Sequence, residues 1–76
     1  MKAFVLCRIA PGLEAEAVKR FRSVEGVTEV YLVFGAWDAI LSVEADTIDK
    51  LSSMITAQLR GIPGVSATET LVTTNL

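Results

Sequence analysis

The sequence has 76 residues, of which 51% are hydrophobic and 21% charged, and its net charge is −2 at pH 7. This length allows a single domain, and a negative net charge offers no basic field, so we expect no direct binding of nucleic acid. There is no His and Cys7 is the only cysteine, which excludes an intrachain disulfide and argues against a metal site or another cofactor.

A domain of this size buries only about 60% of the surface of its unfolded chain and needs further stabilisation. Without disulfides or metals, self-association is the remaining source. The apolar N-terminal run stops at Arg8, too early for a signal peptide, and no stretch approaches the roughly 20 apolar residues of a membrane span. The single unpaired cysteine suits a reducing compartment. Together these features predict a cytoplasmic protein that does not contact a membrane.

The first half of the chain predicts three strands and a helix. Residues 3–9 are rich in β-forming side chains and end before Pro11 and Gly12, as a strand would. Residues 13–26 predict a helix closed by Gly26, with one apolar face formed by Leu13, Ala17, Val18, Phe21 and Val24. Residues 27–34 and 38–44 predict two strands, and the short segment 35–37 between them predicts a hairpin.

The second half predicts a helix and a strand. Asp46 and Thr47 offer an N-cap, and Gly61 and Pro63 end the helix. Its expected apolar stripe consists of Ile48, Leu51, Ile55, Leu59 and Ile62. Residues 65–73 predict the last strand.

The resulting order, β-α-β-β-α-β, predicts an α+β fold of the ferredoxin-like type, as in dimeric α/β barrels. An internal repeat supports it, because Gly26-Val27-Thr28 matches Gly64-Val65-Ser66. Four antiparallel strands would then carry both helices on one face.

The first two strands are apolar on both sides, unlike strands with one face in water. In the first, Phe4 and Leu6 alternate with Val5, Cys7 and Ile9. Two helices cover only one face of a sheet, so the other face would expose an apolar patch. Such a patch predicts a sheet-to-sheet dimer.

The sequence offers little for catalysis. Cys7 lies mid-strand with no His to activate it, and no glycine-rich phosphate loop is present. The segment Gly35-Ala36-Trp37-Asp38 is more specific. Hairpin geometry explains Gly35 and Asp38, through positive φ and side-chain bonds to backbone amides. It does not explain Trp37, which we expect to be exposed at the tip and to contact a ligand or a neighbouring subunit.

Several short motifs, taken in order, resemble the effector-binding RAM domain of the Lrp/AsnC transcriptional regulators. They are Gly26-Val27, Gly35-Ala36-Trp37-Asp38, Asp46, Ile62-Pro63-Gly64-Val65 and Thr68-Glu69-Thr70. The resemblance extends over nearly the whole chain, so residues 1–76 are expected to form one RAM-like ligand-binding and oligomerisation domain. The family's helix-turn-helix is absent, Trp37 stands in an aromatic slot usually held by Tyr or Phe, and Phe34 replaces the usual Thr.

The resemblance implies a homodimer that assembles into a ring, an octamer or a decamer, with an amino acid bound between dimers. Its ligand-binding positions fall here on Gly35, Trp37, Asp38, Gln58, Thr70 and Leu71. A carboxylate such as that of Asp38 suits an α-ammonium group, and turn amides suit an α-carboxylate. The function implied is that of an effector sensor, or of a partner to a full-length Lrp/AsnC regulator, and not of an enzyme.

Three alternatives stay open from the sequence. An ACT domain has the same element order and also binds amino acids, with its ligand expected near Pro11 and Gly12. A small ferredoxin-like enzyme would use His or Asn groups between sheet and helices. A purely structural oligomer would bind no ligand.

Overall fold

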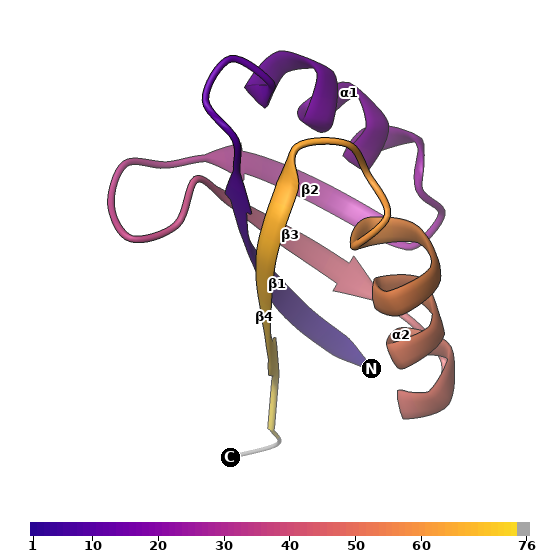
Figure 1. Cartoon of the computed structure of the whole chain (residues 1–76). Helices are drawn as coiled ribbons and strands as arrows, with labels where there is room; N and C mark the ends of the chain where they lie inside the picture. The colour runs from indigo at the N-terminus through magenta and orange to yellow at the C-terminus, as the bar shows by residue number, and fades with distance from the viewer. Residues whose placement is uncertain (75–76) are drawn as a thin grey trace.

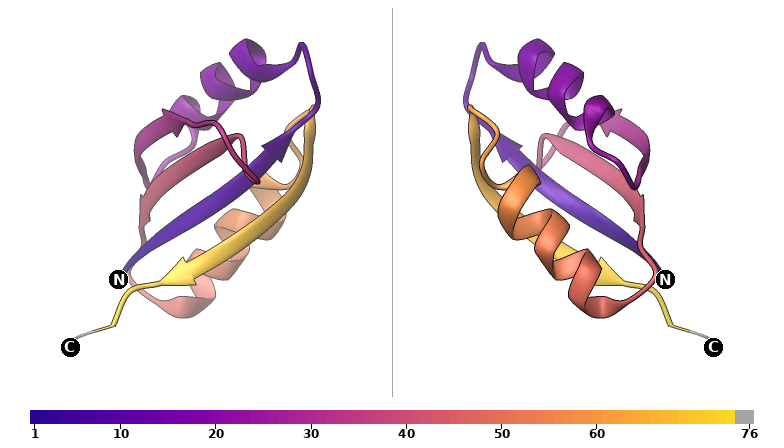
Figure 2. Two further views of the ribbon diagram at one scale, coloured as in Figure 1. Left: turned by 90° about the vertical axis from the view of Figure 1, so that its left-hand side faces the viewer. Right: turned by 90° about the vertical axis from the view of Figure 1, so that its right-hand side faces the viewer.

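A computed structural model describes residues 1–74 of the chain. The elements follow the order β1 (Lys2–Ile9), α1 (Glu14–Ser23), β2 (Val27–Leu32), β3 (Ala39–Glu44), α2 (Ile48–Met54), the π-helical turn η1 (Ile55–Leu59) and β4 (Val65–Val72). The strands form one antiparallel sheet in the order β2-β3-β1-β4 (Figure 1). Both helices lie against the same face (Figure 2). The predicted ferredoxin-like α+β fold is confirmed.

The core lies between the sheet and the two helices, and the two-residue period of the strands selects its members. Buried residues from the strands include Val5, Cys7, Leu41 and Val43, and those from the helical segments include Ala17, Phe21, Leu51 and Leu59. The predicted apolar stripes are therefore confirmed, with two exceptions at helix N-termini. Leu13 and Ile48 are 41% and 53% exposed, because Leu13 is the N-cap of α1 and Ile48 is the first residue of α2.

The internal repeat is visible in two glycines. Gly26 and Gly64 adopt φ values of +98° and +97°, which L side chains rarely adopt. A Cβ on Gly26 would lie 2.9 Å from the carbonyl oxygen of Glu44, and one on Gly64 would lie 2.9 Å from Cβ of Leu13. The prediction that Gly26 closes α1 is wrong, because the helix ends at Ser23 and Val24 is already extended.

The β2–β3 hairpin has a longer loop than predicted. The expected connection was residues 35–37, but β2 ends at Leu32 and β3 begins at Ala39. The loop is closed by a hydrogen bond from the amide of Val33 to the carbonyl of Asp38 (3.0 Å). Asp38 directly precedes β3, and its own amide donates to the carbonyl of Cys7 (2.9 Å). The loop projects beyond the end of the sheet (Figure 1).

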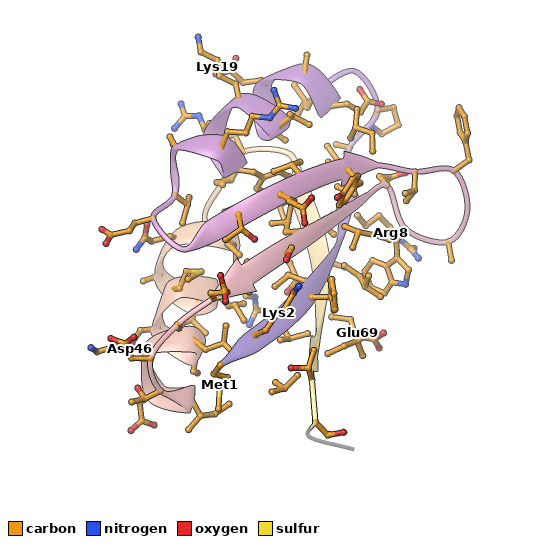
Figure 3. The ribbon with its side chains drawn as sticks, turned by 180° about the vertical axis from the view of Figure 1, so that it is seen from behind. Met1, Lys2, Arg8, Lys19, Asp46 and Glu69 are labelled. Atoms are coloured by element: carbon orange, nitrogen blue, oxygen red, sulfur yellow. The ribbon has the colours of Figure 1, made fainter. Side chains whose placement is uncertain are left out.

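No helix covers the second face of the sheet (Figure 2, left). We call this the open face. Its centre is apolar and consists of Phe4, Leu6, Tyr31, Ile40 and Leu71. Tyr31 and Leu71 are each 50% exposed. The charged side chains of Lys2, Arg8 and Glu69 lie around this centre (Figure 3), and the strand register places Glu29 and Glu44 on the same face. Within residues 1–74 no helix has the length and apolar character to cross a membrane.

Candidate functional site

The β2–β3 loop, residues 33–38, is fastened to the end of β1 by side-chain contacts. Asp38 accepts a hydrogen bond from the backbone amide of Ile9 through Oδ2 (2.7 Å), and Arg8 donates from Nη2 to the carbonyl of Ala36 (2.9 Å). The β1–β4 pairing shifts register between Arg8 and Ile9, where the Asp38 carboxylate supplies the Ile9 amide with an acceptor. The loop therefore has a fixed position.

Trp37 does not stand at the tip of this loop, and the expectation that it is exposed there is wrong. Trp37 is half-buried, and the guanidinium of Arg8 lies 5.3 Å from the centre of its ring, within the range of a cation–π contact. Figure 3 shows Arg8 beside the loop, at the end of β1 away from Lys2. The exposed aromatic residue of this loop is Phe34, with a relative exposure of 107%.

A hollow of about 330 Å³ lies beside the loop. It is lined by Glu14, Leu32, Val33, Phe34 and Asp38. Two carboxylates at one apolar hollow suit a cationic group such as an ammonium. One oxygen of Glu14 also accepts from the amide of Gly12 (2.8 Å).

Sequence reasoning missed Glu14 and Phe34 as members of this hollow. Glu14 had the pattern of a solvated acid in a first helical turn. For Phe34 a signal existed, because it departs from the family pattern next to Gly35.

The backbone of the same loop also offers hydrogen-bond donors. Gly35 has φ +141°, as its glycine identity predicted. Within residues 1–74, no hydrogen bond engages the amides of Gly35 or Ala36. Both can therefore donate to an anionic group.

The other expected ligand positions lie elsewhere in the fold. Thr70 is opposite Val5 on the helix side of the sheet and lines a second hollow, of about 280 Å³, between α2 and β4. Gln58 is exposed and lines a third hollow, of about 590 Å³, whose rim carries Glu44, Asp46, Asp49 and Lys50. Leu71 lies on the open face opposite Phe4. One copy of the chain therefore brings together Gly35, Trp37 and Asp38, and keeps them apart from Gln58, Thr70 and Leu71.

Two titratable side chains, Cys7 and Tyr31, have altered pKa values, and neither has the surroundings of a catalytic group. Burial raises the pKa of the Cys7 thiol from 9.0 to about 11, so it is protonated and a poor nucleophile near neutral pH. The pKa of Tyr31 is raised because its hydroxyl donates a hydrogen bond to Glu29. In the part of the chain that the structure describes, no group of three or more Cys, Asp or Glu side chains is arranged to hold a metal ion.

Comparison with known families gives a match over almost the whole length. The family described as the Lrp/AsnC ligand binding domain matches residues 2–75. The chain belongs to this family. The resemblance found in the sequence motifs is thereby confirmed.

Relatives of this Lrp/AsnC chain include regulators and small proteins. It is 38% identical over 73 residues to the uncharacterized HTH-type transcriptional regulator PH1916 of Pyrococcus horikoshii, an alignment covering 92% of this chain and 49% of that protein. The chain thus spans about half the length of the curated relatives it matches. The crystal structure of FFRP-DM1 is 34% identical, with a TM-score of 0.91, covering 96% of this chain and 97% of the other. The structure of Escherichia coli AsnC is 25% identical, with a TM-score of 0.90, and the match covers 97% of this chain and 51% of AsnC.

Proposed function

We propose that this Lrp/AsnC chain is a regulatory module that binds an amino acid and self-associates. It serves as an effector sensor, or as the partner of a full-length regulator, and not as an enzyme. The observation that carries the proposal is the β2–β3 loop, where two carboxylates line one hollow and the loop itself has two backbone amides without partners in the described chain.

These groups match both ends of an amino acid. Asp38 and Glu14 supply negative charge for the α-ammonium, and the amides of Gly35 and Ala36 supply donors for the α-carboxylate. Asp38 holds the Ile9 amide through Oδ2 only, and Oδ1 makes no hydrogen bond within residues 1–74. The residue can therefore support the loop and contact a ligand at once.

The separation of the remaining positions supports a site shared between copies. Gln58, Thr70 and Leu71 cannot join the loop within one chain, as their places in the fold indicate. A second copy can supply Thr70 or Gln58, whose hydroxyl or amide group would then discriminate between ligand side chains, whereas Leu71 belongs to the open face.

The assembly that we propose begins with a dimer through the open face. An exposed apolar centre with a charged rim is typical of an interface between subunits. Such dimers would then associate into a ring of four or five, giving the octamer or decamer that the family resemblance implies.

Native mass spectrometry with an equimolar mixture of the 20 amino acids tests the binding proposal. We expect the bound mass of one amino acid per chain, a higher melting temperature with that amino acid, and a change in Trp37 fluorescence. Glu14→Gln should weaken binding about tenfold or more, since a charged hydrogen bond contributes roughly 1.5–3 kcal/mol. Glu16→Gln, an exposed change on the same helix, is the matched control.

If no amino acid binds at millimolar concentration, the chain is a structural oligomer and the binding proposal fails. Binding that is unaffected by Glu14→Gln but lost in Pro11→Ala would instead indicate the ACT-like site. The structure gives that site little support, because the amide of Gly12 is already engaged by Glu14.

A further inference from the structure

Arg8 is an exposed cation that leaves most of its hydrogen-bonding capacity unused. A guanidinium group has five N–H donors, and within residues 1–74 only Nη2 of Arg8 donates, to the carbonyl of Ala36 (2.9 Å). In this described part of the chain no carboxylate forms an ion pair with Arg8, whereas Arg20 and Lys50 each have one. The remaining N–H groups of Arg8 are therefore free to bind an anion.

The β2–β3 loop holds this guanidinium in one orientation. Its Cζ lies 5.3 Å from the centre of the Trp37 ring, and the hydrogen bond to Ala36 fixes one of its nitrogens. A planar guanidinium that stacks on an aromatic face keeps its N–H groups in its own plane, where they can meet an acceptor. Since the cation is already oriented, it loses little conformational entropy when it binds.

The loop adds two further donors beside the guanidinium. Among residues 1–74, the amides of Gly35 and Ala36 have no acceptor. The carbonyl that Arg8 holds and one of these amides belong to the same residue, Ala36, so the cation and this amide are separated only by the width of one residue. A carboxylate has two oxygens and can accept from a guanidinium and from backbone amides together.

The neighbouring charges favour an anion with a single negative charge. Asp38 belongs to the same loop, and Glu69 lies on the open face with Arg8 (Figure 3), opposite Leu6. One guanidinium near two carboxylates repels a phosphate dianion more strongly than a carboxylate. The charge balance therefore indicates an organic acid and not a phosphate.

We propose that Arg8 binds the carboxylate of the ligand, together with the amides of Gly35 and Ala36, and so selects ligands that are acids. This inference rests on the proposed function and deepens it. The ligand positions that the family resemblance implies all lie outside β1, and Arg8 adds a residue of that strand. Trp37 then serves as the platform that orients Arg8.

The opposite charge that an amino acid requires is fastened to the next position of β1. The carboxylate of Asp38 accepts from the amide of Ile9 (2.7 Å), which directly follows Arg8. A cation for the α-carboxylate and an anion for the α-ammonium are thus tied to consecutive residues of one strand. This arrangement gives the ligand a single direction in the site.

A comparison of acids with their amides tests the role of Arg8. Native mass spectrometry first identifies which amino acid the wild type retains from an equimolar mixture of the 20, and that amino acid and its carboxamide are then titrated separately. The carboxamide keeps the ammonium group and the side chain but lacks the negative charge. The wild type should bind the acid about tenfold or more tightly than the carboxamide, and Arg8→Gln should lose this preference.

Lys2→Gln is the matched control. Lys2 lies on the same strand and face as Arg8, and its ammonium is also placed over an aromatic ring, 5.5 Å from the centre of Phe4. This variant removes the same charge at the other end of β1 and should keep the preference for the acid. If Arg8 only held the loop in place, Arg8→Gln would weaken the binding of acid and carboxamide equally, and an unchanged preference would overturn the inference.

Sodium acetate separates a failure of this inference from a failure of the proposed function. In ¹⁵N-labelled wild type, acetate at constant ionic strength should shift the signals of the Gly35 and Ala36 amides and of Arg8 Nε–H saturably, and Arg8→Gln should abolish the shifts. These shifts in a chain that retains no amino acid would refute the proposed function and leave the carboxylate site. An amino acid bound without acetate shifts would refute the site, and tighter binding of inorganic phosphate than of acetate would refute its selectivity.

Discussion

At the scale of single residues, Asp38 has the greatest structural consequence. Its carboxylate binds the amide of Ile9, which lies 29 positions away in sequence, and its amide binds the carbonyl of Cys7. A residue expected to serve a local turn therefore joins the β2–β3 loop to β1.

Replacing Asp38 should cost stability as well as ligand binding. Asp38→Ala leaves the Ile9 amide without its acceptor, and we expect the free energy of unfolding to fall by about 1.5–3 kcal/mol. Urea denaturation at a fixed protein concentration measures this loss. Asp38→Asn retains an oxygen acceptor and should lose less than half as much; equal losses in the two variants would contradict the assigned hydrogen bond.

Cys7 gives a pH dependence. Its pKa is raised from 9.0 to about 11 by burial. Below pH 9 the thiol is protonated in both states, whereas between pH 9 and 11 only the unfolded state loses the proton, so stability falls as pH rises. The loss reaches roughly 2 kcal/mol at pH 11, at about 1.4 kcal/mol per pKa unit, because half of the folded thiols are ionised at that pH.

The measurement compares the free energy of unfolding of the wild type and Cys7→Ala from pH 8 to 11. Tyr and Lys titrate in both proteins, so the difference between the two curves isolates Cys7. Parallel curves would show that the thiol ionises freely in the folded chain.

Residue types predicted part of this site and could not predict the rest. Gly35 was predictable because turn chemistry depends on local backbone geometry. The same chemistry predicted that the Asp38 carboxylate accepts from a backbone amide, but not that this amide belongs to Ile9 of β1. The roles of Trp37 and Phe34 were not, because they depend on Arg8, which reaches the loop only after β1 is packed beside it. The sequence contained two aromatic candidates, and the wrong one was expected to project.

At the scale of elements, capping was predictable and irregular geometry was not. Thr47 is the N-cap of α2, with Oγ1 accepting from the amide of Lys50 (3.2 Å), as the Asp46-Thr47 pair predicted. The apolar stripe from Leu51 to Leu59 also predicted a continuous helix. It could not predict the π-helical turn at Ile55–Leu59, because the apolar residues keep a four-residue spacing from Leu51 to Leu59 that is also typical of an α-helix.

The cap predicts a measurable effect on α2. Thr47→Ala should lower the free energy of unfolding by about 1 kcal/mol, because the Lys50 amide loses its acceptor at the helix start. Thr47→Ser keeps the hydroxyl and should stay within a few tenths of a kcal/mol of the wild type. Chemical denaturation of the wild type and the two variants measures this difference. A Thr47→Ala variant with the same free energy of unfolding as the wild type would exclude a stabilising cap.

At the scale of the whole molecule, the topology was predictable because the repeat and the element order agree. The surfaces were only partly predictable. Two-sided apolar strands indicated an open face, but the hollow between α2 and β4 requires knowing which strand lies beside which helix. That neighbourhood is a property of the folded sheet and not of any local pattern.

The open face predicts how the dimer can be separated. Ile40 lies between Leu6 and Tyr31 at its centre, and Ile40→Lys would bury a charge at a subunit contact. We expect a folded monomer by circular dichroism and sedimentation at micromolar concentrations where the wild type is dimeric. Ala15→Lys, which adds the same charge to an exposed position of α1, should remain dimeric; a dimeric Ile40→Lys would place the interface elsewhere.

The position of β1 in the middle of the sheet has a consequence for how the chain folds. β1 pairs with β3 on one side and with β4 on the other, so that Ala3 lies opposite Val72. Pairings between such distant positions require closure of nearly the whole chain before they stabilise anything, and this lowers the folding rate. During synthesis, the centre of the sheet must wait for residues 65–72, and until then the apolar edge of β1 stays unpaired and open to association with other nascent chains.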